Sequence, residues 1–180
     1  MSDLWFTNEE IKLISDLINY ESVEIIWDIN AFYFNTDKST FKLFCETDLP
    51  KGSDYEYDEI FYCRFEKVDE KIGFKSNDPK FWYKIISTDI KIDSVKVIDV
   101  VQVFPNDILI SINELSEFED GLNKLSLGLI IGTEKGLLPA FLLPSNHGFD
   151  WQTKYDFYSE TEIKEVLEKN IKKFELRNLS

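Results

Sequence analysis

The only histidine of the chain, His147, is the first residue to consider for catalysis. A catalytic triad would require His147 to meet Ser145 or a cysteine and to be oriented by an acid such as Asp150. Residues so close in sequence rarely converge in that way, and the segment lacks the G-x-S-x-G pattern of a nucleophile elbow. The sequence therefore predicts a turn or surface role for His147, and a hydrolase that uses His147 and a carboxylate remains an alternative.

The two cysteines, Cys45 and Cys63, each lie in an alternating apolar segment, which favours buried free thiols. The alternation does not set the distance between them, so a disulfide stays open. One histidine and two separated cysteines do not make a zinc set, and the acidic stretches lack EF-hand spacing. Residues 128–136 lack the Gly-Lys-Ser/Thr ending of a phosphate loop. We expect no catalytic residues, no metal and no cofactor.

Negative charge is concentrated in the first third of the chain. The net charge is −14, of which residues 1–60 carry −10 with fourteen acids and four lysines, whereas residues 121–180 are neutral. The densest stretch alternates acids with tyrosines: Asp54, Tyr55, Glu56, Tyr57, Asp58 and Glu59. An extended backbone would place alternate residues on opposite faces. This acidic strip is expected to contact a basic partner protein, and the rival interpretation is a solvated loop or strand edge that keeps the protein soluble.

Trp5 and Trp151 complete the expected partner-binding set, although core burial is the usual role of tryptophan. Trp5 precedes the first predicted helix and Trp151 follows an apolar segment. An aromatic ring beside a carboxylate can grip lysine or arginine through cation–π contact together with charge pairing. We therefore predict that both rings contact the same basic partner as the strip.

The elements that must position these residues begin with a helix from Thr7 to about Asn19, which opens on a capping box formed by Thr7 and Glu10. A second capping box, Ser159 with Glu162, predicts a helix whose apolar stripe runs from Ile163 to Phe174. Between them the alternating apolar runs predict strands at residues 23–29, 32–34, 41–45, 60–68, 81–86, 90–92, 95–104, 108–112, 127–131 and 137–143. The first four strands are expected to form a meander. Hairpins are expected across Pro105 and across Gly136.

These elements predict an α+β fold, with a mostly antiparallel sheet of about seven to nine strands between an N-terminal and a C-terminal helix. No repeat or linker divides the chain, so residues 1–180 are expected to form a single domain. The apolar runs fall short of a membrane span, and the acidic start lacks the pattern of a secretory signal. A cytoplasmic protein without membrane association is expected, and the abundance of Ile, Asn, Lys and Phe suggests a bacterial genome.

Three classes of function remain open from the sequence. The first is a non-catalytic acidic binding protein, such as a bacterial immunity or antitoxin protein that neutralises a basic partner protein. The second is a small-ligand-binding or regulatory domain with an apolar cavity lined by phenylalanines. The third is the hydrolase described above. Nucleic acid is not expected as a partner, because the chain has only two arginines, Arg64 and Arg177, for phosphate and guanine recognition.

Overall fold

Within the described residues, ten antiparallel strands form two five-stranded sheets, which confirms the expected mostly antiparallel fold, whereas one sheet of about seven to nine strands was predicted. The computed structural model describes residues 5–28, 30–48, 60–69, 83–102, 125–145, 148–151, 156–171 and 173–179. Sheet 1 has the order β4 (Ile60–Val68), β3 (Thr40–Asp48), β2 (Ala31–Asn35), β1 (Val23–Asp28) and β5 (Tyr83–Ile90). Sheet 2 has the order β10 (Lys173–Asn178), β6 (Ile92–Gln102), β7 (Leu125–Thr133), β8 (Gly136–Ser145) and β9 (Gly148–Trp151). The order in sheet 1 contains the predicted meander of its first four strands.

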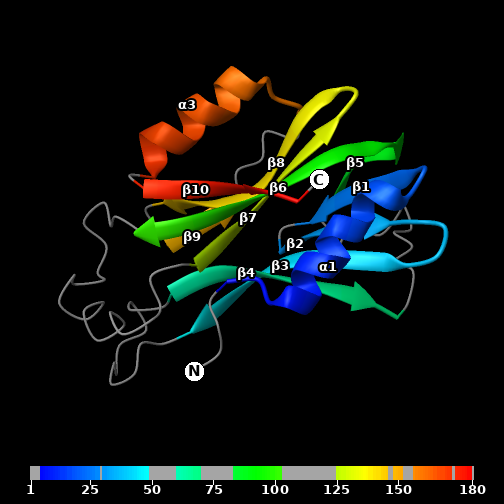
Figure 1. Cartoon of the computed structure of the whole chain (residues 1–180), viewed down its shortest axis with the longest axis horizontal. Helices are drawn as coiled ribbons and strands as arrows, with labels where there is room; N and C mark the ends of the chain where they lie inside the picture. Colours follow the sequence, from blue (N-terminus) through cyan, green and yellow to red (C-terminus); the bar gives the residue numbers. More distant parts are fainter. Residues whose placement is uncertain are drawn as a thin grey trace.

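Both predicted capping boxes start helices in the structure. The helix α1 (Asn8–Asp16) continues into the 3₁₀ turn η1 (Leu17–Asn19), and the helix α3 (Glu160–Asn170) follows Ser159. In each box the hydroxyl of the cap accepts a backbone N–H while the glutamate three residues later accepts the N–H of the cap. Figure 1 shows α3 over sheet 2 and α1 in front of sheet 1. No helix in the described ranges is long and apolar enough to cross a membrane.

The hydrophobic core lies between the two sheets and extends to both helices. Alternation along the strands of sheet 1 turns Phe32, Phe34 and Phe65 inward, where they are almost completely buried. One cluster of buried side chains joins residues of α1, both sheets and α3. Phe6, Phe32, Phe34 and Phe41 of the first third are therefore core residues.

In the part of the chain that the structure describes, the passage from sheet 1 to sheet 2 lies between β5 and β6. Strand β5 ends at Ile90 and β6 begins at Ile92, so only Lys91 separates an edge strand of sheet 1 from an inner strand of sheet 2. The Lys91 ammonium donates to the backbone carbonyls of Ile18 and Tyr20 at the end of η1. The turn after α1 is thereby fixed to the point where the chain passes between the sheets.

The prediction that the last helix continues to Phe174 is wrong. Helix α3 ends at Asn170, Ile171 adopts an extended backbone, and Phe174 belongs to strand β10, which pairs antiparallel with β6. Phe174 follows Ile171 by three residues, a spacing that fits a helix by coincidence, whereas pairing with β6 satisfies the backbone of residues 173–178 in a sheet. Long-range pairing therefore decides the conformation of this segment.

The hairpin across Gly136 is confirmed, because β7 and β8 pair from Thr133–Gly136 onward and Gly136 has a φ of 120°. The hairpin expected across Pro105 lies outside the described residues. The segment after β8, where no strand was predicted, includes the short strand β9, in which Trp151 pairs with Leu142. This strand forms the edge of sheet 2 farthest from β10.

Candidate functional site

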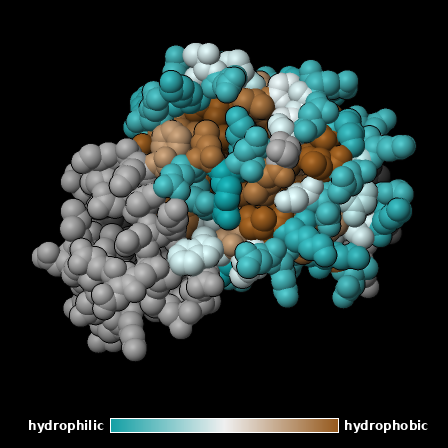
Figure 2. Space-filling model, in the orientation of Figure 1, coloured by the Kyte–Doolittle hydropathy of each residue, from teal (hydrophilic) through white to brown (hydrophobic). Residues whose placement is uncertain are grey.

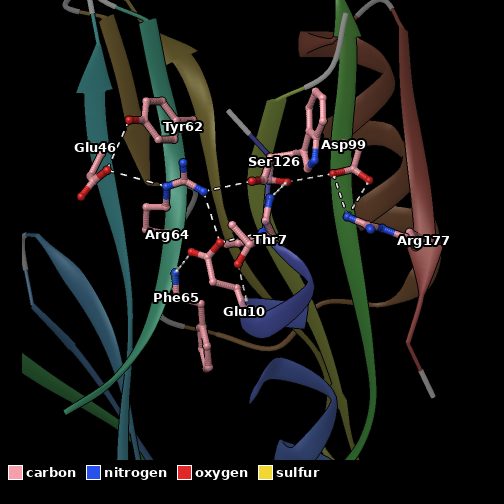
Figure 3. A network of polar contacts seen from close by, with 11 residues as sticks. Thr7, Glu10, Glu46, Tyr62, Arg64, Phe65, Asp99, Ser126 and Arg177 are labelled. Atoms are coloured by element: carbon pink, nitrogen blue, oxygen red, sulfur yellow. Dashed lines mark hydrogen bonds and ion pairs between the residues drawn. The ribbon is translucent and has the colours of Figure 1, made fainter. Parts of the chain in front are cut away.

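A network of polar contacts crosses both sheets and contains the two arginines of the chain (Figure 3). In sheet 1 it centres on Arg64 of β4, and in sheet 2 on Asp99 of β6. The N-terminal segment 5–10 lies between these centres and joins them through its backbone. Because this network gathers charged groups from distant parts of the chain, it is the first candidate for a functional site.

The half of the network in sheet 1 is built around the Glu10 carboxylate. Glu10 Oε2 accepts from Arg64 Nη1 at 3.2 Å and from the Thr7 backbone N–H at 2.7 Å, and Oε1 accepts from the Phe65 backbone N–H at 3.0 Å. Arg64 also donates to the carbonyl of Trp5 at 2.9 Å. Glu10 therefore caps its own helix and covers a backbone donor of the edge strand β4, and both roles stabilise the fold.

The half of the network in sheet 2 is buried more deeply. The Ser126 hydroxyl accepts the N–H of Phe6 at 3.0 Å and donates to Asp99 Oδ1 at 2.9 Å. The Asp99 carboxylate also pairs with Arg177 of β10, with Oδ2 at 3.1 Å from Nη2. Ser126 is fully buried and the Asp99 side chain is 8% exposed. The contacts tie the N-terminal segment to β10 through two strands of sheet 2.

The chemistry of this network is structural. Ser126 is excluded from solvent, and the Asp99 carboxylate beside it is already engaged by Arg177 Nη2, through a hydrogen bond to Oδ1 and an ion pair with Oδ2. Each guanidinium faces a carboxylate, with Arg64 between Glu10 and Glu46. The network holds the two sheets and the N-terminal segment together.

Sequence reasoning missed this network, although one signal for it was present. Glu10 was correctly placed in a capping box, but its contacts with Arg64 and Phe65 join residues more than fifty positions apart. The rarity of arginine was the available signal, since a chain that otherwise uses lysine keeps arginine where a planar, multiply bonded cation is needed. The pairing partners follow only from the strand order.

The structure places the predicted partner-binding residues in different settings. Trp5 is half-buried and contributes its carbonyl to the network, whereas the ring of half-buried Trp151 packs edge-to-face on Phe32 at 5.3 Å. The two tryptophans thus have structural contacts on separate elements. The strip from Asp54 to Glu59 lies outside the described residues, as does His147. The positions that flank the strip, Asp48 and Ile60, pair across β3 and β4.

The two cysteines are direct neighbours in sheet 1. Cys45 and Cys63 are register partners in β3 and β4, and the two thiols do not form a disulfide. Burial is the main cause that raises the pKa of the Cys63 thiol well above its usual value, followed by the proximity of Cys45 and Glu10. Cys63 donates to the carbonyl of Leu127 at 3.1 Å. A protonated thiol in this position is a packing residue and a weak nucleophile.

A second candidate is the outward face of sheet 1, which we call the acidic face. Its members lie on the side of β1 to β4 opposite the core phenylalanines, and Tyr62 among them is itself buried: Glu24, Asp28, Tyr33, Lys42, Phe44, Glu46, Tyr62, Arg64 and Glu66. Tyr33 lies opposite Lys42, and Lys42 lies opposite Glu66, at 4.0 Å between Nζ and Oε1. Carboxylates of three strands therefore surround a row of aromatic rings.

The two cations of the acidic face are already paired. Lys42 contacts Glu66 and lies 4.6 Å from the centre of the Phe44 ring. Arg64 lies 4.9 Å from the centre of the Tyr62 ring and contacts Glu46 as well as Glu10. Four carboxylates therefore face two cations, and the side chains of Glu46 and Glu66 are 46% and 52% exposed. Additional cations would find the exposed carboxylates of Glu46 and Glu66 at this surface.

The pKa of Tyr33 is raised by burial and by the negative charges of the acidic face. Partial burial, the charge and hydrogen bond of Asp28 and the charge of Glu66 raise the pKa of Tyr33 from 10.0 to about 12. The fold therefore favours the protonated phenol. The contribution of the Tyr33 phenol to the free energy of unfolding is fully present below pH 10.0, where this phenol is protonated in the unfolded chain as well. This contribution is lost as the pH rises towards about 12.

This shift predicts that Tyr33→Phe makes stability less sensitive to alkaline pH. Urea unfolding at pH 9 to 12 should show a smaller loss of unfolding free energy in the variant than in the wild type, because the phenylalanine cannot ionise in the unfolded chain. Tyr20→Phe is the control, since it removes a different half-buried phenol, outside the acidic face. An equal pH dependence for wild type and Tyr33→Phe would contradict the prediction.

The described residues give little support for a metal site or for an apolar ligand pocket. No group of three or more His, Cys, Asp or Glu side chains in these ranges could hold a metal ion. A hollow of about 450 Å³ lies between the turn after η1 and the β2–β3 connection. Its lining is mostly polar: Asn19, Tyr20, Glu21, Ser22, Asp37 and Lys38.

Comparison with known proteins adds no family to these observations. The chain was compared with protein-family models, with curated proteins and with solved structures. None of the three comparisons found a match.

Proposed function

We propose that this chain is a non-catalytic acidic binding protein that neutralises a basic partner protein, in the manner of an immunity or antitoxin protein. The observation that supports it is the acidic face, where four carboxylates surround aromatic rings while both cations are already paired. A lysine or arginine of the partner would gain an exposed carboxylate there. Such charge complementarity accelerates association and selects the partner.

The acidic strip extends this proposal along the chain. It belongs to the segment that connects β3 with β4, and the pair Glu46 and Tyr62 of the acidic face lies two residues from each end of that segment. We therefore include Asp54 to Glu59 in the proposed partner surface. Trp5 and Trp151 stay in the proposal only as supporting residues, because both make internal contacts.

The experiment compares two variants of equal net charge. Glu46→Lys with Glu66→Lys reverses charge on the acidic face, and Glu165→Lys with Glu168→Lys reverses the same number of exposed charges on α3. Each protein is immobilised and exposed at low salt to a lysate of its native cell, and retained proteins are identified by mass spectrometry. We expect wild type and the α3 variant to retain the same basic protein, which rising salt releases.

The acidic-face variant should bind that protein at least about tenfold more weakly in a titration, because two attractive contacts become repulsive. If the wild type retained no basic protein, the proposal would be contradicted. Equal loss of binding in both variants would show that total charge acts without the acidic face, and would also contradict it.

A further inference from the structure

The two cysteines of the chain lie opposite each other on strands β3 and β4. Cys45 and Cys63 are register partners within an unbroken pairing of residues 40–48 with residues 60–68. Side chains of register partners lie on the same face of a sheet. For this pair it is the core side, where Cys63 is fully buried and Cys45 packs against the hydrophobic core. The proximity of Cys45 is also one of the causes that raise the pKa of the Cys63 thiol.

The spacing of this pair suits a disulfide bond. Opposite residues of an antiparallel pair have Cα atoms about 4.5 to 5.5 Å apart, and disulfides join Cα atoms about 4.4 to 6.8 Å apart. The Cβ atoms are about 4.5 to 5.5 Å apart in a sheet and about 3.5 to 4.5 Å apart in a disulfide, so a small approach of the two strands closes the bond. Residues two positions out of register, about 7 to 8 Å apart, are too distant. The strand register therefore selects these two thiols.

The two thiols differ in their access to solvent. Hydrophobic side chains reach the surface in the middle of the face shown in Figure 2, bordered by hydrophilic ones, so the apolar core is not sealed everywhere. Cys45 is another partly accessible residue of this kind, since it is half-buried and its Sγ donates to the carbonyl of Glu46 at 3.5 Å in an exposed contact. Cys63 is 0% exposed, and its Sγ donates to the carbonyl of Leu127 of β7 at 3.1 Å. A reagent in solution therefore meets Cys45 before Cys63.

We propose that Cys45 and Cys63 form a redox modification site, at which a low-molecular-weight disulfide converts the two thiols into a cross-strand disulfide. The thiolate of Cys45 attacks one sulfur of the reagent, so that a mixed disulfide forms and one small thiolate leaves. Cys63 then loses its proton and attacks Sγ of Cys45, which releases the second small thiolate. The protons of the two cysteines pass to the leaving thiolates. The protein thus loses two electrons and two protons, and the reagent is reduced to two thiols.

The burial of Cys63 determines the order of the two steps. Burial raises the pKa of this thiol well above its usual value, so little of it is thiolate at neutral pH. Cys63 therefore does not react with the reagent directly. Its attack on the mixed disulfide depends on proximity, because Cys45 lies directly opposite. We expect the mixed disulfide on Cys45 to accumulate first, and a higher pH to accelerate the closure of the protein disulfide.

The disulfide would close a covalent ring of residues 45–63. In sequence this ring includes the acidic strip from Asp54 to Glu59. Ring closure restricts the unfolded chain more than the native sheet, in which the two cysteines are already neighbours. The oxidised protein should therefore melt at least about 4 °C above the reduced protein. The stability of the two strands that flank the strip would then depend on the redox state.

The first test treats the reduced chain with a small excess of hydroxyethyl disulfide and follows its mass. The protein should first gain one hydroxyethylthio group and then lose it, which leaves a monomer lighter by two hydrogens than the reduced protein. Trypsin cleaves after Lys51, so Cys45 and Cys63 lie in separate peptides that the disulfide should hold together until it is reduced. A lasting adduct on Cys45 without closure, a disulfide between two chains, or two unmodified thiols would each overturn the proposal.

Two variants test the pairing of the thiols. In Cys63→Ala the adduct on Cys45 should persist, because no thiol lies opposite it, and treatment should not raise the melting temperature. Cys45→Ala with Thr47→Cys moves the accessible thiol two positions along β3, diagonal to Cys63, and should close the ring at least about tenfold more slowly than the wild type. Closure at the wild-type rate would contradict selection by strand register.

The wild-type peptides decide the proposal even if a variant does not fold. An oxidised wild type that melts no higher than the reduced protein would contradict the expected stabilisation. None of these measurements uses a basic partner protein, so their failure is distinguishable from a failure of the proposed function.

Discussion

Replacing Gly128 by alanine is expected to lower the free energy of unfolding by about 3–5 kcal/mol, because overpacking and backbone strain act together. A Cβ atom at this position would lie 2.3 Å from the carbonyl oxygen of Ala140 and 2.6 Å from the Cα of Phe141. Both are backbone atoms of the neighbouring strand β8 and cannot move by a side-chain rotation. Gly128 also has a φ of 138°, which side chains disfavour.

Gly132→Ala in the same strand is the matched control for Gly128→Ala. Its Cβ would meet mainly the Ser94 hydroxyl, which can rotate away, and no positive φ is involved. Chemical denaturation should show a loss at Gly132 of less than about 1.5 kcal/mol. Similar losses at the two glycines would contradict the view that the backbone of β8 fixes the need for glycine at position 128.

Removal of the Arg64 guanidinium should have the second-largest effect. Arg64→Met keeps an apolar side chain of similar length but leaves the Glu10 carboxylate without its cation, and both side chains are only about one-eighth exposed, at 13% and 12%. We expect a loss of about 2–4 kcal/mol, since an unpaired carboxylate at a largely buried site is costly. Urea unfolding followed by circular dichroism measures this loss.

Two further variants show whether the burial of the Arg64–Glu10 pair is the cause of the expected loss of stability. Lys164→Met removes the cation of an exposed pair with Glu168, with side chains 70% and 58% exposed, and should cost less than about 0.5 kcal/mol. Adding Glu10→Gln to Arg64→Met should recover part of the loss, because the uncompensated charge is then gone. An Arg64→Met variant as stable as Lys164→Met would mean that the network contributes little.

Local chemistry predicted most of the elements of this fold. The two capping boxes start their helices at Thr7 and Ser159, and strand β4 has the predicted bounds of 60–68. The alternating apolar segment around Cys63 predicted a buried thiol, and Cys63 is buried. These features depend on neighbours in sequence, which a periodic pattern reports directly.

The arrangement of the elements and the candidate sites could not be predicted in the same way. Pairing of Cys45 with Cys63 depends on strand register, and the acidic face depends on the order of four strands. Strand β10 was missed because Phe174 continues a helical spacing that only pairing with β6 overrides. The strip from Asp54 to Glu59 remains a prediction, and the acidic face is a surface that the sequence alone did not reveal.

The contact between Phe6 and Ser126 has a consequence for how quickly the protein folds. This hydrogen bond closes a loop of 120 residues, and Asp99 then joins Arg177 across a separation of 78 residues. Loop closure of this length must precede any gain from the contact, so topologies rich in such contacts fold slowly. We therefore expect the sheets to assemble first and the segment 5–10 to close over them last. During that interval the donor of β4 that Glu10 covers would be open to pairing, which makes aggregation before closure the main hazard during refolding.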